Sequence, residues 1–270
     1  MLRVRFVFAG IAAMLLLGIF LLPRVQATGG TGRPANDSAQ RTPVLVELFT
    51  SEGCSDCPPA DALLERLDRS QPVSGAELIV LSEHVDYWND IGWKDPFSSH
   101  EYSERQGSYA GQFGLGSVYT PQMVVDGRIQ LVGSDERGAI EAIENATKAE
   151  KIPVSLSSAH FDGQKILLHI ETGPSPSSIS ERFANVLLAI ADESDQSSVS
   201  RGENAGRTLR HVAVLRDLVR VGALDRSGKF SQDVAINSNH GNKGNLRIVA
   251  IVQEPTAGRV LGVGSARLSN

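Results

Sequence analysis

Residues 43–57 read PVLVELFTSEGCSDC, and this stretch decides the fold. The opening run to Phe49 is almost purely apolar, which is typical of a strand buried on both faces. A short turn then leads into Cys54 and Cys57, the only two cysteines of the chain. The sequence therefore predicts a buried strand that ends at a cysteine pair.

An amphipathic helix is expected directly after the cysteines. Pro58 and Pro59 do not oppose it, because N–H groups in a first helical turn lack intrahelical partners. Asp61, Glu65 and Arg66 are expected to point to solvent, opposite an apolar face with helical spacing. That face consists of Ala60, Leu63, Leu64 and Leu67.

The next elements complete an α/β pattern up to residue 150. A second apolar run at 77–82 closes a strand-helix-strand unit, whose crossover favours a parallel sheet. Residues 87–116 read as an elaborated crossover with a helix over 98–109. The dipeptide Asp126-Gly127 predicts a hairpin over 122–132, and a closing helix is expected over 135–149.

Beyond Ile152 the helical spacing gives way to apolar or alternating runs typical of strands. We therefore predict an α/β domain over residues 43–150, followed by an all-β, sandwich-like domain over residues 151–270. The predicted strands are 154–156, 166–170, 184–191, 209–221, 246–252 and 260–268.

The N-terminus has the features of an export signal. Two arginines precede an apolar run from Phe6 to Leu22, and Ala27 suits a cleavage site. We predict a signal peptide over residues 1–27 and a flexible linker over 28–42, in a periplasmic or secreted protein. The alternative is an uncleaved anchor, which is the only membrane contact expected.

The overall charge disfavours polyanion partners. The formal net charge is -5 and the sequence pI is about 5.7, so no electrostatic term draws the protein to nucleic acid or to an anionic membrane surface. Residues 201–209 lack the ending of a phosphate-binding loop, so nucleotide binding is not expected, and no cofactor is implied.

Two residues between Cys54 and Cys57 allow a disulfide at a helix N-terminus. Cys54 would attack a substrate disulfide, and Cys57 would resolve the mixed disulfide. Glu52 and Asp56 add negative charge, which opposes thiolate formation. The alternative is a permanent structural disulfide, although closing so short a loop removes little chain entropy.

The pattern from Val46 to Cys57 resembles the active-site stretch of the thioredoxin superfamily. Val118-Tyr-Thr-Pro121, placed before a strand, resembles the Thr-cis-Pro element of that superfamily. The resemblance implies that Thr120 and Pro121 face the cysteines and hold extended substrate backbone. The alternative for Pro121 is an ordinary trans proline that opens a strand.

Several further stretches together resemble an exported bacterial family catalogued as domain of unknown function 1223. The resemblance covers most of residues 43–270 and implies a thioredoxin-like first domain, without an agreed substrate or activity. It rests on residues 49–61, 84–88, 92–96, 119–122 and 201–209, and on His211.

Three further side chains are candidates for proton transfer. By analogy with the superfamily's strand acid, Glu47 would accept a proton from Cys57; the alternative is a surface charge at the strand end. His84, Asp86 and Trp88 fall at strand spacing, so they would share one face if the backbone stays extended. His84 and Asp86 would form a proton relay or polar wall, or else a structural hydrogen-bonded cluster.

The sequence favours a thiol-disulfide oxidoreductase acting on protein or small thiol and disulfide substrates, with an unidentified redox partner. A first alternative is copper or zinc binding by Cys54, Cys57 and His84, with Asp86 completing the set. A second alternative is a non-catalytic secreted binding module with a structural disulfide.

Overall fold

The computed structural model describes residues 41–179, 183–237 and 245–268 of the 270 residues. The predicted signal peptide, and the predicted linker up to residue 40, lie outside the described residues. The remaining two linker residues are described, and the second of them, Thr42, already begins the first strand.

The predicted strand-helix-strand unit is confirmed. Strand β1 (Thr42–Thr50) leads through the cysteine turn into helix α1 (Pro58–Ser70) and strand β2 (Ala76–His84). β1 and β2 are parallel along their whole length, from Thr42 opposite Ala76 to Thr50 opposite His84. The cysteines therefore lie at the carboxyl end of β1, where open α/β sheets place their sites.

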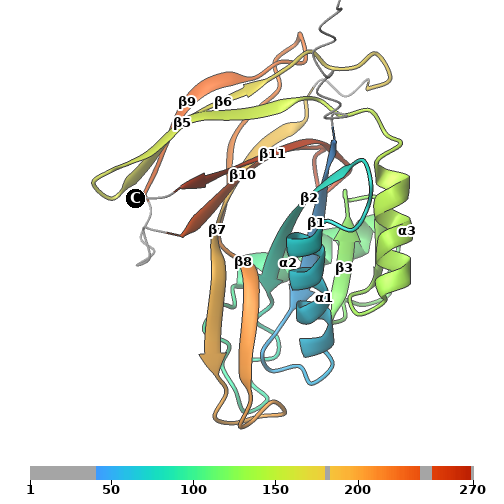
Figure 1. The fold of residues 1–270 in the computed structure, drawn as a ribbon, viewed down its shortest axis with the longest axis vertical. Helices are drawn as coiled ribbons and strands as arrows, with labels where there is room; N and C mark the ends of the chain where they lie inside the picture. Colours follow the sequence, from blue (N-terminus) through green and yellow to red (C-terminus); the bar gives the residue numbers. More distant parts are fainter. Residues whose placement is uncertain (1–40, 180–182, 238–244, 269–270) are drawn as a thin grey trace, which may run out of the picture. The chain divides into compact units, whose positions relative to one another are not determined.

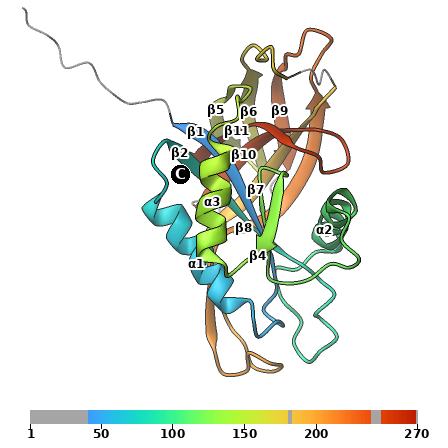
Figure 2. The same ribbon diagram turned by 90° about the vertical axis from the view of Figure 1, so that its right-hand side faces the viewer.

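The remaining elements of the first half surround this unit. Helix α2 (His100–Phe113) lies within the predicted crossover, and helix α3 (Glu136–Ala146) follows the hairpin. The hairpin strands β3 (Gln122–Val125) and β4 (Ile129–Val132) extend the sheet on the free side of β1. Helices α1 and α3 cover one face of β1, and α2 covers the other (Figure 2).

Four strands of the second half continue the same sheet. They form one eight-stranded mixed sheet in the order β11-β10-β7-β8-β2-β1-β3-β4 (Figure 1). The junction is parallel, with Ser82 of β2 opposite Val214 of β8. These strands are β7 (Asn185–Ser198), β8 (Thr208–Ala223), β10 (Leu246–Gln253) and β11 (Val260–Leu268).

A second, three-stranded antiparallel sheet has the order β5-β6-β9. Its apolar face packs on β7, β10 and β11, with Ile166 and Leu168 against Leu188 and Ile248. The sequence predicted its first two strands but missed the third, which is exposed at alternate positions. The strands are β5 (Val154–Asp162), β6 (Lys165–Thr172) and β9 (Ser231–Asn237).

The expectation of a separate sandwich-like domain after residue 150 therefore needs refinement. The described elements beyond that point are all strands, as expected, and two sheets do pack face to face there. One of these sheets, however, is the sheet of the first half. β8 covers the edge that β2 would otherwise expose, and unpaired edges favour such strand addition.

Asp61 departs from the sequence expectation, because it is buried rather than pointed to solvent. It lies on α1 at the boundary of the apolar face, where β8 packs against the helix. Among the described residues, no helix is long and apolar enough to cross a membrane.

Candidate functional site

The cysteine pair forms a disulfide at the N-terminus of α1. The Cα atoms of Cys54 and Cys57 are 5.5 Å apart, and Cys57 is the N-cap residue of the helix. The Cys57 carbonyl accepts the N–H of Ala60 at 2.9 Å, which begins the helical pattern. The partial positive charge of a helix N-terminus favours a thiolate here once the bond is reduced.

Both cysteines are buried in this disulfide state. Cys54 is 1% exposed and Cys57 is 0% exposed, whereas the intervening Ser55 and Asp56 are exposed. A substrate sulfur can therefore reach Cys54 only if the residues around it move.

The connection between β7 and β8, residues 199–207, covers the cysteine turn. The Asn204 side-chain amide donates to the carbonyl oxygens of Glu52 and Cys54, both at 2.9 Å. The Ser55 N–H donates to a Glu203 carboxylate oxygen at 3.0 Å. The second half of the chain thus holds the turn through backbone groups on both sides of Cys54.

Glu52 lies in this turn with its carboxylate fully buried. Trp93 Nε1 donates to Glu52 Oε2 at 2.8 Å, and the Ser197 hydroxyl donates to Oε1. His211 Nε2 faces Oε1 at 3.2 Å. Burial raises the pKa of Glu52, but the hydrogen bonds from His211 and Ser197 outweigh it, so the pKa is lowered and the carboxylate stays ionised.

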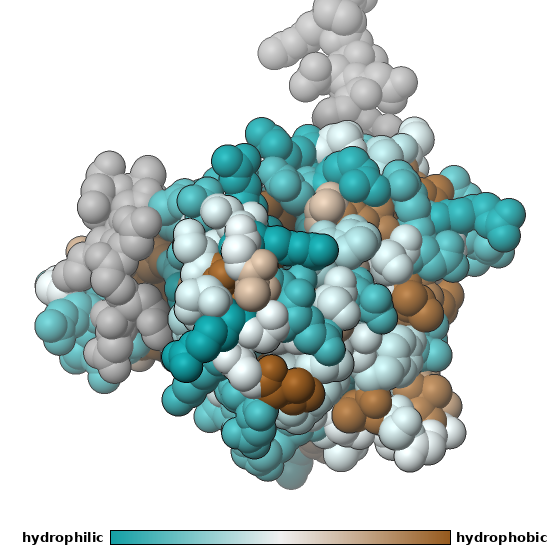
Figure 3. Space-filling view, turned by 90° about the horizontal axis from the view of Figure 1, so that it is seen from below, coloured by the Kyte–Doolittle hydropathy of each residue, from teal (hydrophilic) through white to brown (hydrophobic). Residues whose placement is uncertain are grey.

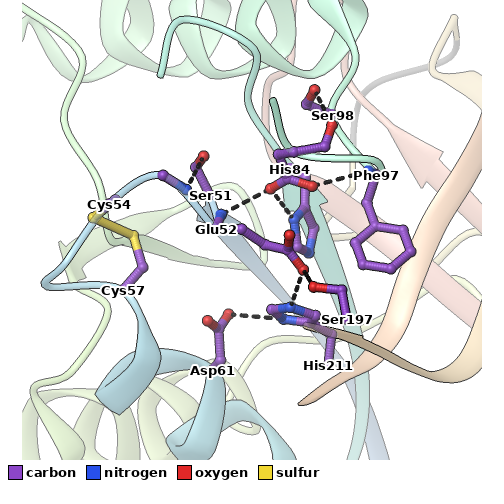
Figure 4. A network of polar contacts seen from close by, with 12 residues as sticks. Ser51, Glu52, Cys54, Cys57, Asp61, His84, Phe97, Ser98, Ser197 and His211 are labelled. Carbon is purple, nitrogen blue, oxygen red and sulfur yellow. Dashed lines mark hydrogen bonds and ion pairs between the residues drawn. A yellow bond between two sulfur atoms is a disulfide. The ribbon is translucent and has the colours of Figure 1, made fainter. Parts of the chain in front are cut away.

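His211 of β8 lies between two carboxylates. Its Nε2 faces Glu52, and its Nδ1 lies 3.8 Å from Asp61 Oδ1 (Figure 4). Burial lowers the pKa of His211, but Asp61 and Glu52 outweigh burial and raise the pKa to about 10. The ring is therefore an imidazolium at neutral pH.

His84, at the end of β2, contacts a different carboxylate. Its Nδ1 lies 2.7 Å from Asp95 Oδ2, which also accepts the N–H of Glu52 at 2.8 Å. Burial raises the pKa of Asp95, but His84 outweighs it and the pKa is lowered. The His84 ring is nearly perpendicular to that of His211, with the centroids 4.6 Å apart. His84 thus belongs to the polar network behind the cysteine turn.

Asp86 is not part of that network. It accepts from the Ser103 hydroxyl at 2.5 Å and lies 3.2 Å from His100 Nδ1. The hydrogen bond from Ser103 lowers the pKa of Asp86. The shared face expected for His84 and Asp86 does not form, because β2 ends at His84 and the chain does not continue as a strand.

The peptide bond between Thr120 and Pro121 is cis, as expected from the sequence. Trp88 connects this bond to the cysteine turn, because its Nε1 donates to Thr120 Oγ1 at 2.8 Å. A β-carbon at Gly53 would lie 3.0 Å from Cβ of Trp88. Trp88 therefore occupies the space beside the residue that precedes Cys54, which explains why glycine is present there.

Glu47 is fully buried but faces away from α1. Val46 and Leu48 pack in the α1 cluster, so the alternation of β1 places Glu47 on the opposite face. There Arg105 Nε donates to Glu47 at 2.8 Å, and the Tyr109 hydroxyl donates at 2.6 Å. The structure therefore does not bring Glu47 to Cys57.

The side chains that the metal-binding alternative requires, those of Cys54, Cys57, His84 and Asp86, do not lie together. His84 is directed to Asp95, and Figure 4 shows its ring apart from the disulfide. Over the described ranges, no group of three or more His, Cys, Asp or Glu side chains is placed to hold a metal ion.

The geometry defines a thioredoxin-like protein, with a cysteine pair at the start of α1 and a cis-proline before β3. The family model "Protein of unknown function (DUF1223)" matches residues 45–253, and the chain belongs to this family. No curated protein gives a significant match.

Two solved structures are similar over most of the chain. A crystal structure of an Agrobacterium tumefaciens protein, target AtR35, has 28% identity and a TM-score of 0.63, covering 86% of this chain and 96% of that one. HBP35 of Porphyromonas gingivalis has 14% identity and a TM-score of 0.60, covering 84% of this chain and 76% of that one. At this identity, the second match supports the fold alone.

The stretches that carried the family resemblance meet at this site. Trp88, Asp95 and Asn204, from three separate stretches, all contact the turn before Cys54 or its immediate partners. Sequence reasoning missed the contacts of Asp61 and Asn204, and it did not select His211 or Asp95 as site residues. The signal was the family resemblance, because its stretches 49–61, 92–96 and 201–209, together with His211, contain all four residues. That resemblance assigns them no chemical role.

Proposed function

We propose that the protein is an exported thiol-disulfide oxidoreductase that uses the Cys54–Cys57 pair. The observation that carries the proposal is the placement of this disulfide at the start of α1, connected through Trp88 to the cis bond of Thr120 and Pro121. The partial positive charge of the helix N-terminus favours the Cys54 thiolate that starts disulfide exchange. The loop of residues 118–121, here called the proline loop, would hold the substrate backbone beside it.

The reaction balances without a cofactor. In the reduced protein, the Cys54 thiolate attacks a substrate disulfide, and one substrate sulfur leaves as a thiolate. Cys57 then loses its proton and attacks Cys54, which re-forms the Cys54–Cys57 bond and releases the second substrate thiol. The pair loses two electrons and the Cys57 proton; the substrate disulfide gains them and leaves as one thiolate and one thiol.

The surface around the turn favours a protein substrate. The end of the molecule that carries the turn is mostly hydrophilic, with separate apolar patches (Figure 3). Tyr87, Ile91 and Val118 are exposed apolar residues of the segments that hold Trp88 and Pro121. An extended polypeptide laid along the proline loop would contact such residues.

A second candidate function follows from the burial of the sulfurs. With Cys54 1% exposed and the turn held by Asn204 and Glu203, the disulfide could be a permanent part of a binding module. In that case the pair would resist mild reductants, since the covered disulfide is inaccessible to thiolates.

The test is a redox titration of residues 28–270 in graded glutathione buffers, with free thiols counted at each ratio. Reversible reduction, and a glutathione adduct that accumulates at Cys54 only in Cys57→Ser, are expected. The matched variant Cys54→Ser should form no such adduct. A pair that stays oxidised until the protein unfolds would instead establish the structural disulfide.

Export is tested separately by N-terminal sequencing of the protein recovered from the cell envelope. A mature N-terminus at Thr28 is expected. Recovery of the whole chain from the cytoplasmic fraction would contradict export.

A further inference from the structure

We propose that Asp61 is the base that takes the proton of the Cys57 thiol, and that His211 is the positioning residue that holds Asp61 for this task. The inference rests on the proposed oxidoreductase function and adds the proton path for the resolving cysteine.

Asp61 lies one helical turn after Cys57. Its N–H donates to the Cys57 carbonyl at 3.1 Å, so the two residues lie on the same side of α1. Helical side chains tilt toward the N-terminus, and this tilt directs the Asp61 carboxylate back over the turn that contains Cys57. In Figure 4 the carboxylate lies between the disulfide and the His211 ring.

The Asp61 carboxylate is buried and incompletely bonded. The side chain is 7% exposed, and within the described residues its Oδ1 has no hydrogen-bond partner. A buried carboxylate oxygen without a donor is costly, so such atoms in native structures call for an explanation. His211 Nδ1 lies 3.8 Å from this oxygen, too far for a hydrogen bond, so Oδ1 is left able to accept a proton from the Cys57 thiol.

His211 supplies a positive charge beside the Asp61 carboxylate. The titratable groups that face the His211 ring are Glu52 from the cysteine turn, Asp61 from α1 and His84 from β2. Asp195 of β7 also interacts with it, while being held by Arg216. With a raised pKa of about 10, His211 remains cationic over the pH range of thiol exchange.

The proton path accounts for every atom in the resolving step. The Cys57 S–H bond breaks and its proton moves to Asp61, while the sulfur electron pair forms the bond to Cys54. The bond between Cys54 and the substrate sulfur breaks, and the leaving thiolate receives the proton from Asp61 through solvent. Glu47 is the strand acid that the sequence suggested as proton acceptor. It lies on the other face of β1, so it cannot be the base that accepts the Cys57 proton.

The experiment mixes the reduced protein with excess oxidised glutathione between pH 5 and pH 9 and follows release of glutathione from the transient mixed disulfide at Cys54. In the unsubstituted protein, the release rate should be nearly flat from about pH 6 to about pH 8, because an ionised base removes the need for a free thiolate. In Asp61→Asn the rate should fall about 100-fold at pH 6 and approach the unsubstituted rate near pH 9, where the thiol ionises unaided.

Three further variants make the result specific. Glu141→Gln removes an exposed carboxylate of α3, outside the cysteine motif, and should leave the profile unchanged. Asp61→Glu should recover part of the loss. His211→Gln should move the midpoint of the acid limb upward by about one pH unit, because a carboxylate without its cation protonates more readily.

The outcomes separate the two proposals. An unsubstituted protein whose rate rises tenfold per pH unit up to the thiol pKa overturns the relay, and so does an unchanged profile in folded Asp61→Asn. The first of these results does not depend on whether Asp61→Asn folds. If the reduced unsubstituted protein consumes no oxidised glutathione and Cys57→Ser forms no adduct, the oxidoreductase function itself fails.

Discussion

Asn204 and Cys54 are 150 positions apart in the sequence, yet the Asn204 side-chain amide donates to the Cys54 carbonyl at 2.9 Å. The same amide donates to the Glu52 carbonyl at 2.9 Å, so one side chain satisfies two buried acceptors of the cysteine turn. A residue of the connection between β7 and β8 thereby determines how tightly the turn is held. This contact leads to a first prediction.

Asn204→Ala should loosen the cysteine turn. Two buried carbonyls lose their donor, which should lower the free energy of unfolding by about 1–3 kcal/mol. Reduction of the disulfide by dithiothreitol should become faster, because the cover over Cys54 weakens. The exposed Asn145→Ala is the control. Equal reduction rates in the two variants would show that the Asn204 contact does not limit access.

Stability should decline at alkaline pH through His211. Its pKa rises from the model-compound value of 6.5 to about 10 on folding, so the folded state binds the extra proton. The stabilisation is complete below about pH 6.5 and is lost as the pH rises through about 10, at up to about 1.4 kcal/mol per pH unit. Urea unfolding at several pH values measures the slope.

His211→Gln should remove the contribution of His211 to the pH dependence of the free energy of unfolding. The difference between the two proteins isolates His211 from other groups that titrate at high pH, such as Lys151, whose pKa is lowered by burial. Parallel curves for both proteins would mean that His211 is neutral in the folded state.

The face of the sheet opposite the disulfide depends on Arg105. The guanidinium contacts Glu47 at 2.5 Å and lies 3.5 Å from Glu83. Burial and the nearby Glu47 raise the pKa of Glu83 well above its usual range. With Glu83 protonated, the guanidinium is the cation of Glu47, so Arg105→Met should lower the free energy of unfolding by about 3–5 kcal/mol by leaving the buried Glu47 carboxylate unpaired.

The control for Arg105 is an exposed ion pair. Arg66 and Glu136 have side chains that are 54% and 62% exposed, so Arg66→Met should change stability by less than about 1 kcal/mol. Equal effects of the two substitutions, measured by urea unfolding, would contradict the role of burial.

A chain that ends at Glu150 should not fold by itself. Leu45, Ile79 and Leu81 of the first half pack against Leu215 and Val249 of the second half. Removal of the second half exposes that surface together with the edge of β2. We expect aggregation and no cooperative thermal transition by circular dichroism for residues 28–150. A cooperative monomer would show that the first half is an independent domain.

The local parts of the fold could be predicted because short-range patterns encode them. The run before Phe49, the helical spacing after Pro58 and the Asp126-Gly127 turn each specify one element without reference to distant residues. Thr120 and Pro121 could be predicted for a different reason, namely their resemblance to a known motif.

The rest depends on pairings between residues far apart in the sequence. Nothing in the pattern of β8 indicates that Val214 lies opposite Ser82, so the shared sheet could not be predicted. Asp61 has the polarity of a surface residue, and its burial becomes understandable only when His211 is placed beside it. The grouping of His84 with Asp86 assumed an extended backbone beyond His84, where the strand ends.

The long separation between Cys54 and Asn204 also has a consequence during synthesis. Chains emerge from the ribosome from the N-terminus onward, so the cysteines appear 150 residues before the side chain that covers them. For that interval Cys54 and Cys57 lack the cover that residues 199–207 later provide. The two thiols therefore meet thiols and oxidants in an unfolded chain before the contact that buries them can form.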